Sequence, residues 1–314
     1  MTAKTTPTTE TNLEDLYPSR VKSHPEALDR LDPVVYGTAQ DGPLTGEQLI
    51  QYERDGFLIL PAFFSDHEVA VFRAELTDLR DCQETKQKPE AILEPDHSEL
   101  RSLFSVHKSE ISPLFAKVAS DKRIVQMTKQ ILGSEVYIHQ SRVNLKPGFA
   151  GKEFYWHSDF ETWHVEDGMP RMRAVSCSLL LDQNYEFNAP LMLLPESQQE
   201  YIPCIGEAPH DHYQNSLRRQ EFGIPDHRSL AEMVNRYGIM QGVGPAGSLI
   251  LFDCNIMHGS NSNITPLPRS NLFFVYNSTS NYLAQPFGNR NPRPEFIATR
   301  EDCDPIVPQT VTYF

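Results

Sequence analysis

Residues 154–164 of the chain, FYWHSDFETWH, place two histidines, two acidic residues and both tryptophans of the protein within eleven positions. On a β-strand alternate side chains project to the same face, so His157 and Asp159 would lie side by side with Ser158 turned away. The aromatic residues before His157 make this segment apolar, and burial of a carboxylate there is costly unless a metal ion or another partner compensates it. We therefore predict that His157 and Asp159 bind a metal ion.

A third ligand is predicted at His258, which follows the apolar segment GSLILFD at residues 247–253. Two histidines and one carboxylate are typical of Fe(II) sites that keep coordination positions open for substrate and dioxygen. Arg269 follows His258 by eleven residues, and an arginine can hold a carboxylate by two parallel hydrogen bonds. A His-x-Asp pair alone is a weak signal. The similar HDH at residues 210–212 lacks a flanking strand pattern, so we interpret it as a solvated loop.

This constellation of His157, Asp159, His258 and Arg269 resembles the Fe(II)- and 2-oxoglutarate-dependent dioxygenases of the phytanoyl-CoA dioxygenase type. The run HSDFETWHVEDGMP at residues 157–170 is much more specific, and it resembles the ectoine hydroxylases within that group. The similarity covers most of the chain, from about residue 14 to residue 300. It implies a mainly β fold with flanking helices, the double-stranded β-helix or jelly roll of cupin-like proteins.

The resemblance also implies roles for individual residues. His157, Asp159 and His258 would bind Fe(II), and Arg269 would pair with the distal carboxylate of the cosubstrate 2-oxoglutarate, helped by Asn144 and Ser260. The positions that match those around ectoine are Gln140, Thr162, Trp163, Phe252, Phe273 and Arg290, with Arg293 as a nearby alternative to Arg290. The implied reaction uses dioxygen to hydroxylate ectoine to 5-hydroxyectoine, with release of succinate and carbon dioxide.

The elements that must position these residues follow from local patterns. Thr45 with Gln48 and Ser65 with Glu68 form capping-box signatures that predict helices over residues 45–56 and 65–79. Further helices are predicted over 120–133 and 226–238. Short β-type segments follow from residue 135 onward, which favours a sandwich or jelly roll. The strands are expected near residues 57–61, 136–145, 153–160, 173–181, 189–195, 247–253 and 271–277.

Composition limits the domain organisation and the class of partner. A 314-residue chain with 39% hydrophobic and 22% charged residues is expected to be globular. We expect a disordered tail at residues 1–12, then one jelly-roll domain over 13–314 with N-terminal helices. A long insertion at residues 196–247 suggests a functional element such as a lid.

The formal net charge of −14 argues against nucleic acid as a partner, because clustered Lys and Arg are needed to hold phosphates. Five scattered cysteines without a CxxC pair favour reduced thiols over disulfides or a thiolate zinc site. No apolar stretch approaches the roughly 18 residues of a membrane span, and the N-terminus lacks the apolar core of a signal peptide. We expect a cytoplasmic protein whose partners are small molecules.

Several alternatives stay open from the residues. A related hydroxylase acting on another small amino-acid-like solute, such as proline, would use the same iron motif. A non-catalytic cupin-like metal-binding protein would not need open iron positions or a carboxylate clamp. A zinc hydrolase is disfavoured because catalytic zinc more often uses three histidines or histidines with a glutamate. A homodimer is also kept open, since the sequence does not determine the oligomeric state.

Overall fold

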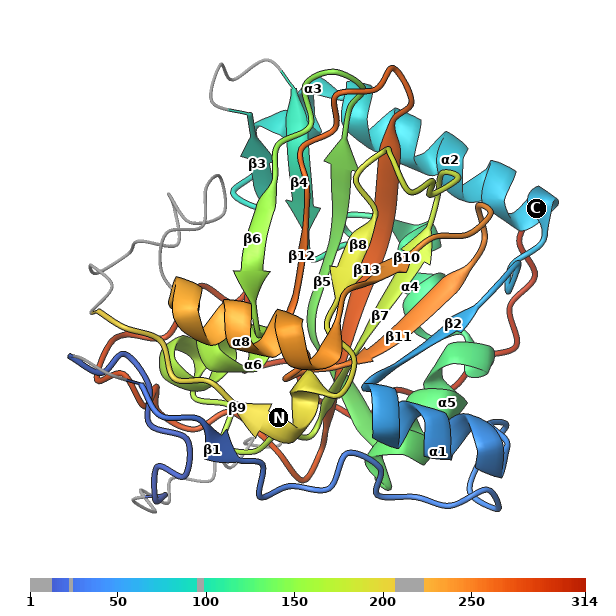
Figure 1. Ribbon diagram of the computed structural model, residues 1–314. Coiled ribbons are helices and arrows are strands. Elements are labelled where there is room, and N and C mark those ends of the chain that lie inside the picture. Colours follow the sequence, from blue (N-terminus) through green and yellow to red (C-terminus); the bar gives the residue numbers. More distant parts are fainter. Residues whose placement is uncertain (1–12, 23–24, 95–98, 207–222) are drawn as a thin grey trace.

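The computed structural model describes residues 13–22, 25–94, 99–206 and 223–314. Its centre is an antiparallel seven-stranded sheet (Figure 1). In spatial order the strands are β2 (Phe57–Leu60), β11 (Leu249–Asp253), β7 (Ala174–Leu180), β13 (Arg269–Ser278), β5 (Val136–Lys146), β4 (Leu100–Phe104) and β3 (Ala91–Leu93). A four-stranded antiparallel sheet has the order β10 (Met240–Gly242), β8 (Leu191–Leu193), β12 (His258–Ser260) and β6 (Phe154–His157). The predicted jelly-roll fold class is confirmed.

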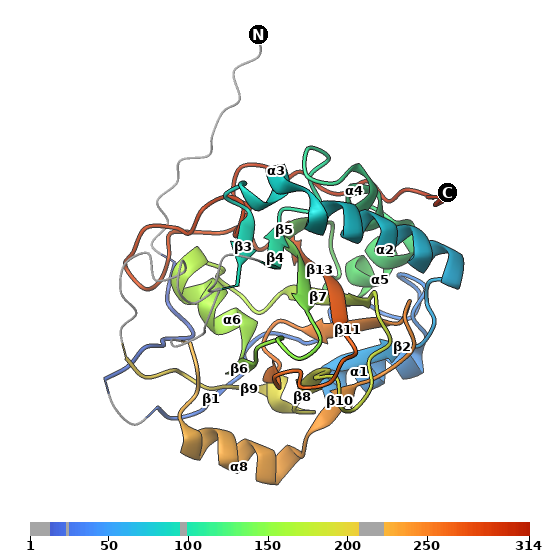
Figure 2. The same ribbon diagram turned by 90° about the horizontal axis from the view of Figure 1, so that it is seen from above.

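Helices cover the outer face of the large sheet. They are α1 (Gly46–Asp55), α2 (Asp66–Asp81), α3 (Gln83–Lys86), α4 (Pro113–Ala119) and α5 (Lys122–Leu132). Both predicted capping boxes are present: Thr45 and Gln48 cap α1, and Ser65 and Glu68 cap α2. Gly56 and Gly133 end α1 and α5 in the left-handed conformation that glycine adopts without strain. Figure 2 shows α2, α4 and α5 on one side of the large sheet and β6, β8 and α8 on the other.

Two of the apolar clusters join the layers of the fold. The larger core, which includes Phe72, Val125 and Leu272, joins the outer helices to the large sheet. A smaller core lies between the two sheets and includes Leu193, Phe252 and Phe273. Other buried positions of the strands carry polar residues.

Strand β5 carries such a polar row. Alternate residues of a strand share a face, so Gln140, Arg142, Asn144 and Lys146 project from the same side of β5. Its neighbour β13 pairs in antiparallel register, with Asn144 opposite Asn271 and Lys146 opposite Arg269. The polar row therefore runs along the inside of the jelly roll toward the start of β13.

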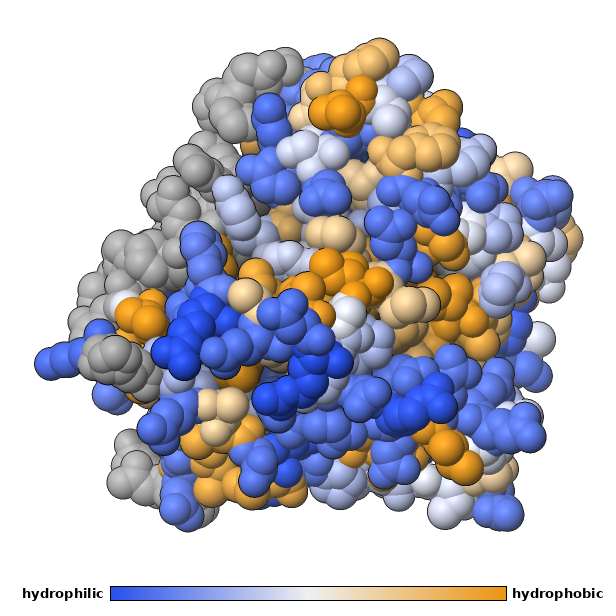
Figure 3. Space-filling model, in the orientation of Figure 1, coloured by the Kyte–Doolittle hydropathy of each residue, from blue (hydrophilic) through white to orange (hydrophobic). Residues whose placement is uncertain are grey.

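The described part of residues 196–247 contains regular secondary structure. It contains η2 (Ser197–Gln199), β9 (Glu200–Tyr201), which pairs with β1 (Leu28–Asp29), and the predicted helix α8 (His227–Tyr237). Helix α8 packs through Met233 against Leu194 and Met257, and its outer face is hydrophilic (Figure 3). The predicted tail at 1–12 and the HDH at 210–212 lie outside the described residues. No described helix has both the length and the apolar character needed to cross a membrane.

A buried ion pair ties the N-terminal segment to the end of β11. Arg30 donates to both carboxylate oxygens of Asp253, at 2.7 and 3.0 Å, and also to the carbonyls of Asp32 and Met172. Both charged side chains are buried, at 2% and 3% exposure. Removing one partner of such a pair leaves an uncompensated charge, so Arg30→Met is expected to lower the free energy of unfolding by about 3–5 kcal/mol.

Denaturant unfolding monitored by circular dichroism measures this loss. The control is Arg54→Met, whose partner Asp55 is adjacent and whose own side chain is 63% exposed. That variant should lose less than about 1 kcal/mol. Equal losses in both variants would contradict the role assigned to Arg30.

Candidate active site

The three predicted metal ligands meet at the inner face of the small sheet. His157 on β6 and His258 on β12 are directly paired across the two strands, and their ring centroids are 4.3 Å apart. Asp159 Oδ1 lies 3.6 Å from His157 Nε2, and Asp159 Oδ2 lies 3.8 Å from His258 Nε2. One ligand atom from each residue falls within 4.8 Å of the others, so one metal ion can be bound by all three.

The local structure around Asp159 differs from the expectation of a continuous strand over 153–160. Strand β6 ends at His157, Ser158 is extended, and Asp159 is the first residue of α6 (Asp159–Thr162). The chain turns here because Phe160 N–H donates to Cys254 O, at the end of β11. Helix α6 runs into a π-helical turn, η1 (Trp163–Asp167). Such turns occur frequently at functional sites.

Hydrogen bonds hold both imidazoles in the form that binds a metal. His157 Nδ1 lies 2.6 Å from Tyr155 O, and His258 Nδ1 lies 3.0 Å from Ile256 O. Because a carbonyl only accepts, each Nδ1 carries the proton, and each Nε2 keeps its lone pair for the metal. Burial, with a contribution from His157, lowers the pKa of His258 to about 4, which keeps it neutral.

Asp159 is held as a carboxylate. Its burial opposes ionisation, but the facing imidazoles of His258 and His157 in their protonated form, together with the guanidinium of Arg142, outweigh that effect and hold its pKa below the usual range. A charged oxygen ligand beside two neutral nitrogen ligands suits Fe(II). The residues present therefore fit the metal that the motif implies.

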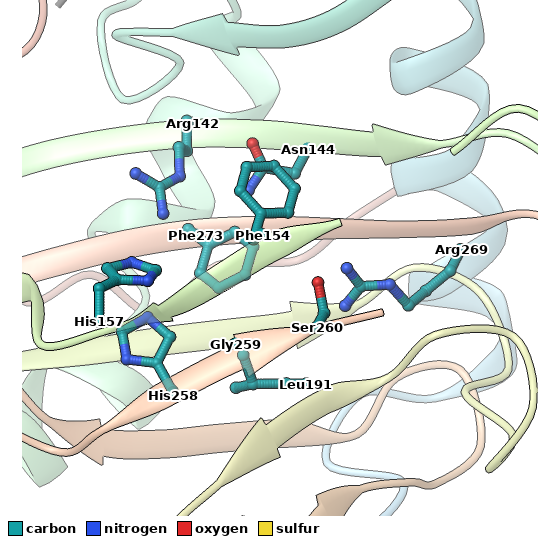
Figure 4. A pocket seen from close by; sticks show the side chains of 10 residues that line it. All are labelled: Arg142, Asn144, Phe154, His157, Leu191, His258, Gly259, Ser260, Arg269 and Phe273. Atoms are coloured by element: carbon teal, nitrogen blue, oxygen red, sulfur yellow. The ribbon is translucent and has the colours of Figure 1, made fainter. Parts of the chain in front are cut away.

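A pocket extends from the two histidines to Arg269 (Figure 4). The histidines lie at one end, and Arg269 and Ser260 lie at the other. Of the predicted cosubstrate and substrate residues, four line it: Asn144, Ser260, Arg269 and Phe273. The complete lining is Arg142, Asn144, Phe154, His157, Leu191, His258, Gly259, Ser260, Arg269 and Phe273.

The Arg269 end of the pocket is prepared for an anion. The side chain of Arg269 is buried, and its Nε and Nη1 have no hydrogen-bond partner among the described residues. Burial lowers its pKa to about 10, only slightly offset by Asp182. Buried donors of this kind are normally satisfied. A ligand carboxylate that accepts two parallel hydrogen bonds would satisfy them.

Known proteins with a similar sequence identify the family of the chain. A profile of the phytanoyl-CoA dioxygenase family (PhyH) matches residues 52–271. The ectoine dioxygenase of Stutzerimonas stutzeri is 53% identical over 293 residues, which cover 93% of this chain and 96% of that protein. The chain belongs to the ectoine dioxygenases of the phytanoyl-CoA dioxygenase family. The family predicted from the iron motif and the run at 157–170 is thereby confirmed.

Solved ectoine dioxygenase structures share the architecture. EctD from S. alaskensis with 2-oxoglutarate and 5-hydroxyectoine aligns with a TM-score of 0.85 at 46% identity, covering 94% of this chain and 98% of that one. The same protein with bound Fe aligns with a TM-score of 0.80 at 44% identity, over 93% and 97% of the two chains. The carbocyclase SnoK of nogalamycin biosynthesis, at 16% identity, a TM-score of 0.59 and coverage of 82% and 90%, shares the fold alone.

The remaining predicted substrate residues do not line the pocket. Phe252 lies beside the site, with its ring centroid 5.2 Å from that of His258. Gln140 is buried and accepts a hydrogen bond from Arg142 at 2.7 Å. Thr162 ends α6, and Trp163 begins η1. Their contact with substrate stays a prediction.

Arg290 and Arg293 are the two candidates for binding the carboxylate of ectoine, and an ion pair of Arg293 bears on the choice between them. Arg293 Nε and Nη2 donate to the two carboxylate oxygens of Asp167 at 2.7 and 2.6 Å, and this pair is buried. The fork of Arg293 is therefore committed to Asp167. Arg290 keeps its predicted role, although it is not a lining residue of the pocket.

Sequence reasoning missed several lining residues of the ectoine dioxygenase pocket. Arg142 was not singled out, although it stands two positions from both Gln140 and Asn144 on β5. The signal was available as the polar alternation Gln-x-Arg-x-Asn-x-Lys within a buried strand. Leu191 and Phe154 come from ordinary apolar segments, so no sequence signal separated them from core residues.

Proposed function

We infer that the protein catalyses the Fe(II)- and 2-oxoglutarate-dependent hydroxylation of ectoine to 5-hydroxyectoine, with release of succinate and carbon dioxide. The observation that carries this inference is the cluster of His157, Asp159 and His258 at one end of a pocket whose other end holds Arg269, with its Nε and Nη1 unpartnered among the described residues. Relatives named ectoine dioxygenase, and an EctD structure that holds 2-oxoglutarate and 5-hydroxyectoine, support the same reaction.

His157, Asp159 and His258 would hold the iron. When bound, iron supplies the oxidising chemistry with dioxygen and couples decarboxylation of 2-oxoglutarate to hydroxylation of a C–H bond. The protein residues keep the ligand set ready: the carbonyls of Tyr155 and Ile256 orient the imidazoles. Burial of His258 and Asp159 excludes bulk water from the ligands.

The cosubstrate would lie along the pocket, with its distal carboxylate on Arg269. Ser260 faces the same end of the pocket. Asn144 lines the pocket, and its amide oxygen accepts a hydrogen bond from Ser102 at 2.7 Å, which fixes the orientation of the amide group. That amide is therefore positioned to donate to an oxygen of the 2-oxo acid.

Ectoine would lie on the histidine side of the pocket. It is a small cyclic zwitterion with a carboxylate and a delocalised cationic ring. Its carboxylate requires a cationic partner, and its ring requires aromatic faces. Arg290 would serve the carboxylate, and Trp163 with Phe252 and Phe273 would serve the ring. Gln140 and Thr162 would supply polar contacts.

The reaction itself provides the first test. Purified protein is loaded anaerobically with Fe(II) and 2-oxoglutarate, then given oxygen with ectoine or with proline. We expect succinate and hydroxyectoine in equal amounts with ectoine, and little succinate with proline. Succinate formed faster with proline would favour the alternative hydroxylase, and absence of succinate in all reactions would reject the dioxygenase function.

Trp163→Phe tests the substrate side. Tryptophan is the best aromatic partner for a cation, and a desolvated contact contributes on the order of 1–2 kcal/mol, so the KM for ectoine should rise roughly tenfold. The KM for 2-oxoglutarate should stay unchanged. The matched control is Trp156→Phe, because this second tryptophan packs against the apolar cluster of Leu194 and Met257. A similar rise in both variants would contradict the role of Trp163.

Two further expectations stay predictions: a cytoplasmic location and a homodimer. Sedimentation equilibrium measures the oligomeric state directly. A monomer at micromolar concentration would reject the homodimer without affecting the proposed reaction.

A further inference from the structure

Lys146 is a buried lysine at the far end of the pocket. It is the last residue of β5, lies directly opposite Arg269 in the β5–β13 register, and is 2% exposed. Its Nζ donates to Ser260 Oγ at 2.8 Å and to Asn261 O at 2.6 Å. The same Nζ lies 5.3 Å from the ring centroid of Phe154. Lys146 therefore stands immediately behind two residues that line the pocket, Ser260 and Phe154.

This lysine has no counter-ion in the described part of the chain. Burial, Arg269 and Arg101 lower its pKa to about 6, and the more distant Glu153 and Glu94 only partly oppose them. Arg101 on β4 and Glu94 pair with each other at 3.4 Å, and Glu153 accepts a hydrogen bond from Ser262. Two buried basic side chains in register, Lys146 and Arg269, repel each other when both are charged, which disfavours the charged form of Lys146 in the ligand-free protein. Their arrangement is favourable once an anion binds between the sheets.

The hydrogen bond to Ser260 has a directional consequence. An ammonium group has donors and no acceptor, so a protonated Lys146 forces Ser260 Oγ to accept. The Ser260 hydroxyl hydrogen is then free to donate into the pocket, toward the end at which Arg269 lies (Figure 4). A hydroxyl and a guanidinium that both donate to one point match the oxygens of a carboxylate.

We propose that Lys146 is a positioning residue for the distal carboxylate of 2-oxoglutarate, which it serves by orienting the Ser260 hydroxyl and by adding a second positive charge beside Arg269. This inference rests on the proposed function. To Arg269, Ser260 and Asn144 it adds a fourth residue that acts on the cosubstrate and not on the iron.

The proposal predicts a measurable change in the protonation of Lys146 when 2-oxoglutarate binds. In the free protein the lysine is largely neutral above pH 6, and a bound dianion favours its charged form and raises its pKa. At a pH between the pKa of Lys146 in the free protein and its pKa in the complex, binding of 2-oxoglutarate is therefore accompanied by uptake of a proton at Lys146. Over that interval the affinity should fall by up to about tenfold per pH unit as the pH rises.

The experiment uses the Fe(II)-loaded protein under anaerobic conditions without ectoine, so that no turnover occurs. Calorimetric titration with 2-oxoglutarate at pH 8, in buffers of low and high ionisation enthalpy, counts the protons taken up. The wild type should take up most of one proton. Lys146→Met should take up none and should bind 2-oxoglutarate at least about tenfold more weakly, as expected for lost hydrogen bonding to a charged group.

Two further variants separate positioning from general damage. Because one of the two effects of Lys146 passes through Ser260, the loss in the double variant should be smaller than the sum of the losses in Lys146→Met and Ser260→Ala. Lys146→Arg keeps a charge that does not titrate, so its affinity should recover toward wild type and become independent of pH between 6 and 9. The control is Lys152→Met, an exposed lysine six positions further along the chain, which should behave as wild type.

Each outcome decides the proposal. Absence of proton uptake in the wild type overturns it without any variant. Additive losses in the double variant, or unchanged affinity in Lys146→Met, also overturn it. If the wild type binds 2-oxoglutarate and hydroxylates ectoine, and Lys146→Met binds 2-oxoglutarate equally well, only the role of Lys146 is rejected. A wild type that does not bind 2-oxoglutarate rejects the proposed function as well.

Discussion

We expect Asp159→Asn to lower the rate of hydroxyectoine formation by more than about a hundredfold. Substitution of residues that merely support a metal ligand costs about 10–100-fold, and loss of a charged ligand must exceed that range. Asparagine has the same shape but supplies no negative charge, and Asp159 is the only carboxylate in the described three-residue cluster. Iron binding should weaken in parallel with activity.

Two measurements test this loss. Product analysis gives the rate of hydroxyectoine formation, and anaerobic titration with Fe(II) and 2-oxoglutarate gives the visible absorption of the loaded protein. Thermal unfolding without metal should change little, because the substitution preserves volume and removes a buried charge. The control is Asp81→Asn, a 60% exposed carboxylate paired with Arg80. Retained iron binding in Asp159→Asn would contradict the ligand assignment.

Arg269→Met should raise the KM for 2-oxoglutarate by more than about a hundredfold, because two hydrogen bonds to a charged group contribute about 1.5–3 kcal/mol each. The KM for ectoine should change far less. Arg269→Lys should recover only part of the loss, since an ammonium group does not reproduce the planar fork.

The same substitution should leave the ligand-free protein equally or more stable. Arg269 is buried with two unpartnered nitrogens and lies opposite Lys146. Replacing such a charge by an apolar side chain of similar length removes a desolvation cost. In wild type, 2-oxoglutarate should raise the unfolding temperature, and in Arg269→Met it should not.

Thermal unfolding with and without 2-oxoglutarate gives both answers. Arg228→Met serves as the control for loss of one positive charge, because Arg228 is 87% exposed on α8. A marked loss of stability in ligand-free Arg269→Met would show that Arg269 supports the fold rather than the cosubstrate.

Local interactions were readable from the sequence. The capping boxes of α1 and α2 depend on residues three positions apart, so Thr45 with Gln48 and Ser65 with Glu68 predicted both helix starts. Glycines that allow left-handed backbone marked the ends of α1 and α5. The strands with continuous apolar runs, such as β11 and β13, were likewise predicted near their observed positions.

Short and polar strands were not readable. Strands β3 and β4 extend the large sheet, but β3 has only three residues, and β4 buries Arg101 through its pair with Glu94. Strand β3 is apolar but too short to show a period, and Arg101 and Ser102 interrupt the apolar residues of β4. The ion pair with Glu94, which compensates the buried Arg101, is not evident from the strand's own sequence. The expected strand across Asp159 was wrong for a related reason: a hydrogen bond from Phe160 to Cys254, far along the chain, turns the backbone into α6.

The sequence by itself predicted His157, Asp159 and His258 as metal ligands and Arg269 as a carboxylate-binding residue, because two histidines, one carboxylate and an arginine have few other uses in that combination, and the structure brings the three predicted ligands together. Only the tertiary structure decided which polar side chains pair with one another and which face the pocket. Pairing of β5 with β13 places Lys146 opposite Arg269 and behind Ser260. The Asp167 carboxylate engages Arg293. These choices depend on distances between residues far apart in the chain, and charge and spacing along a sequence do not encode such distances.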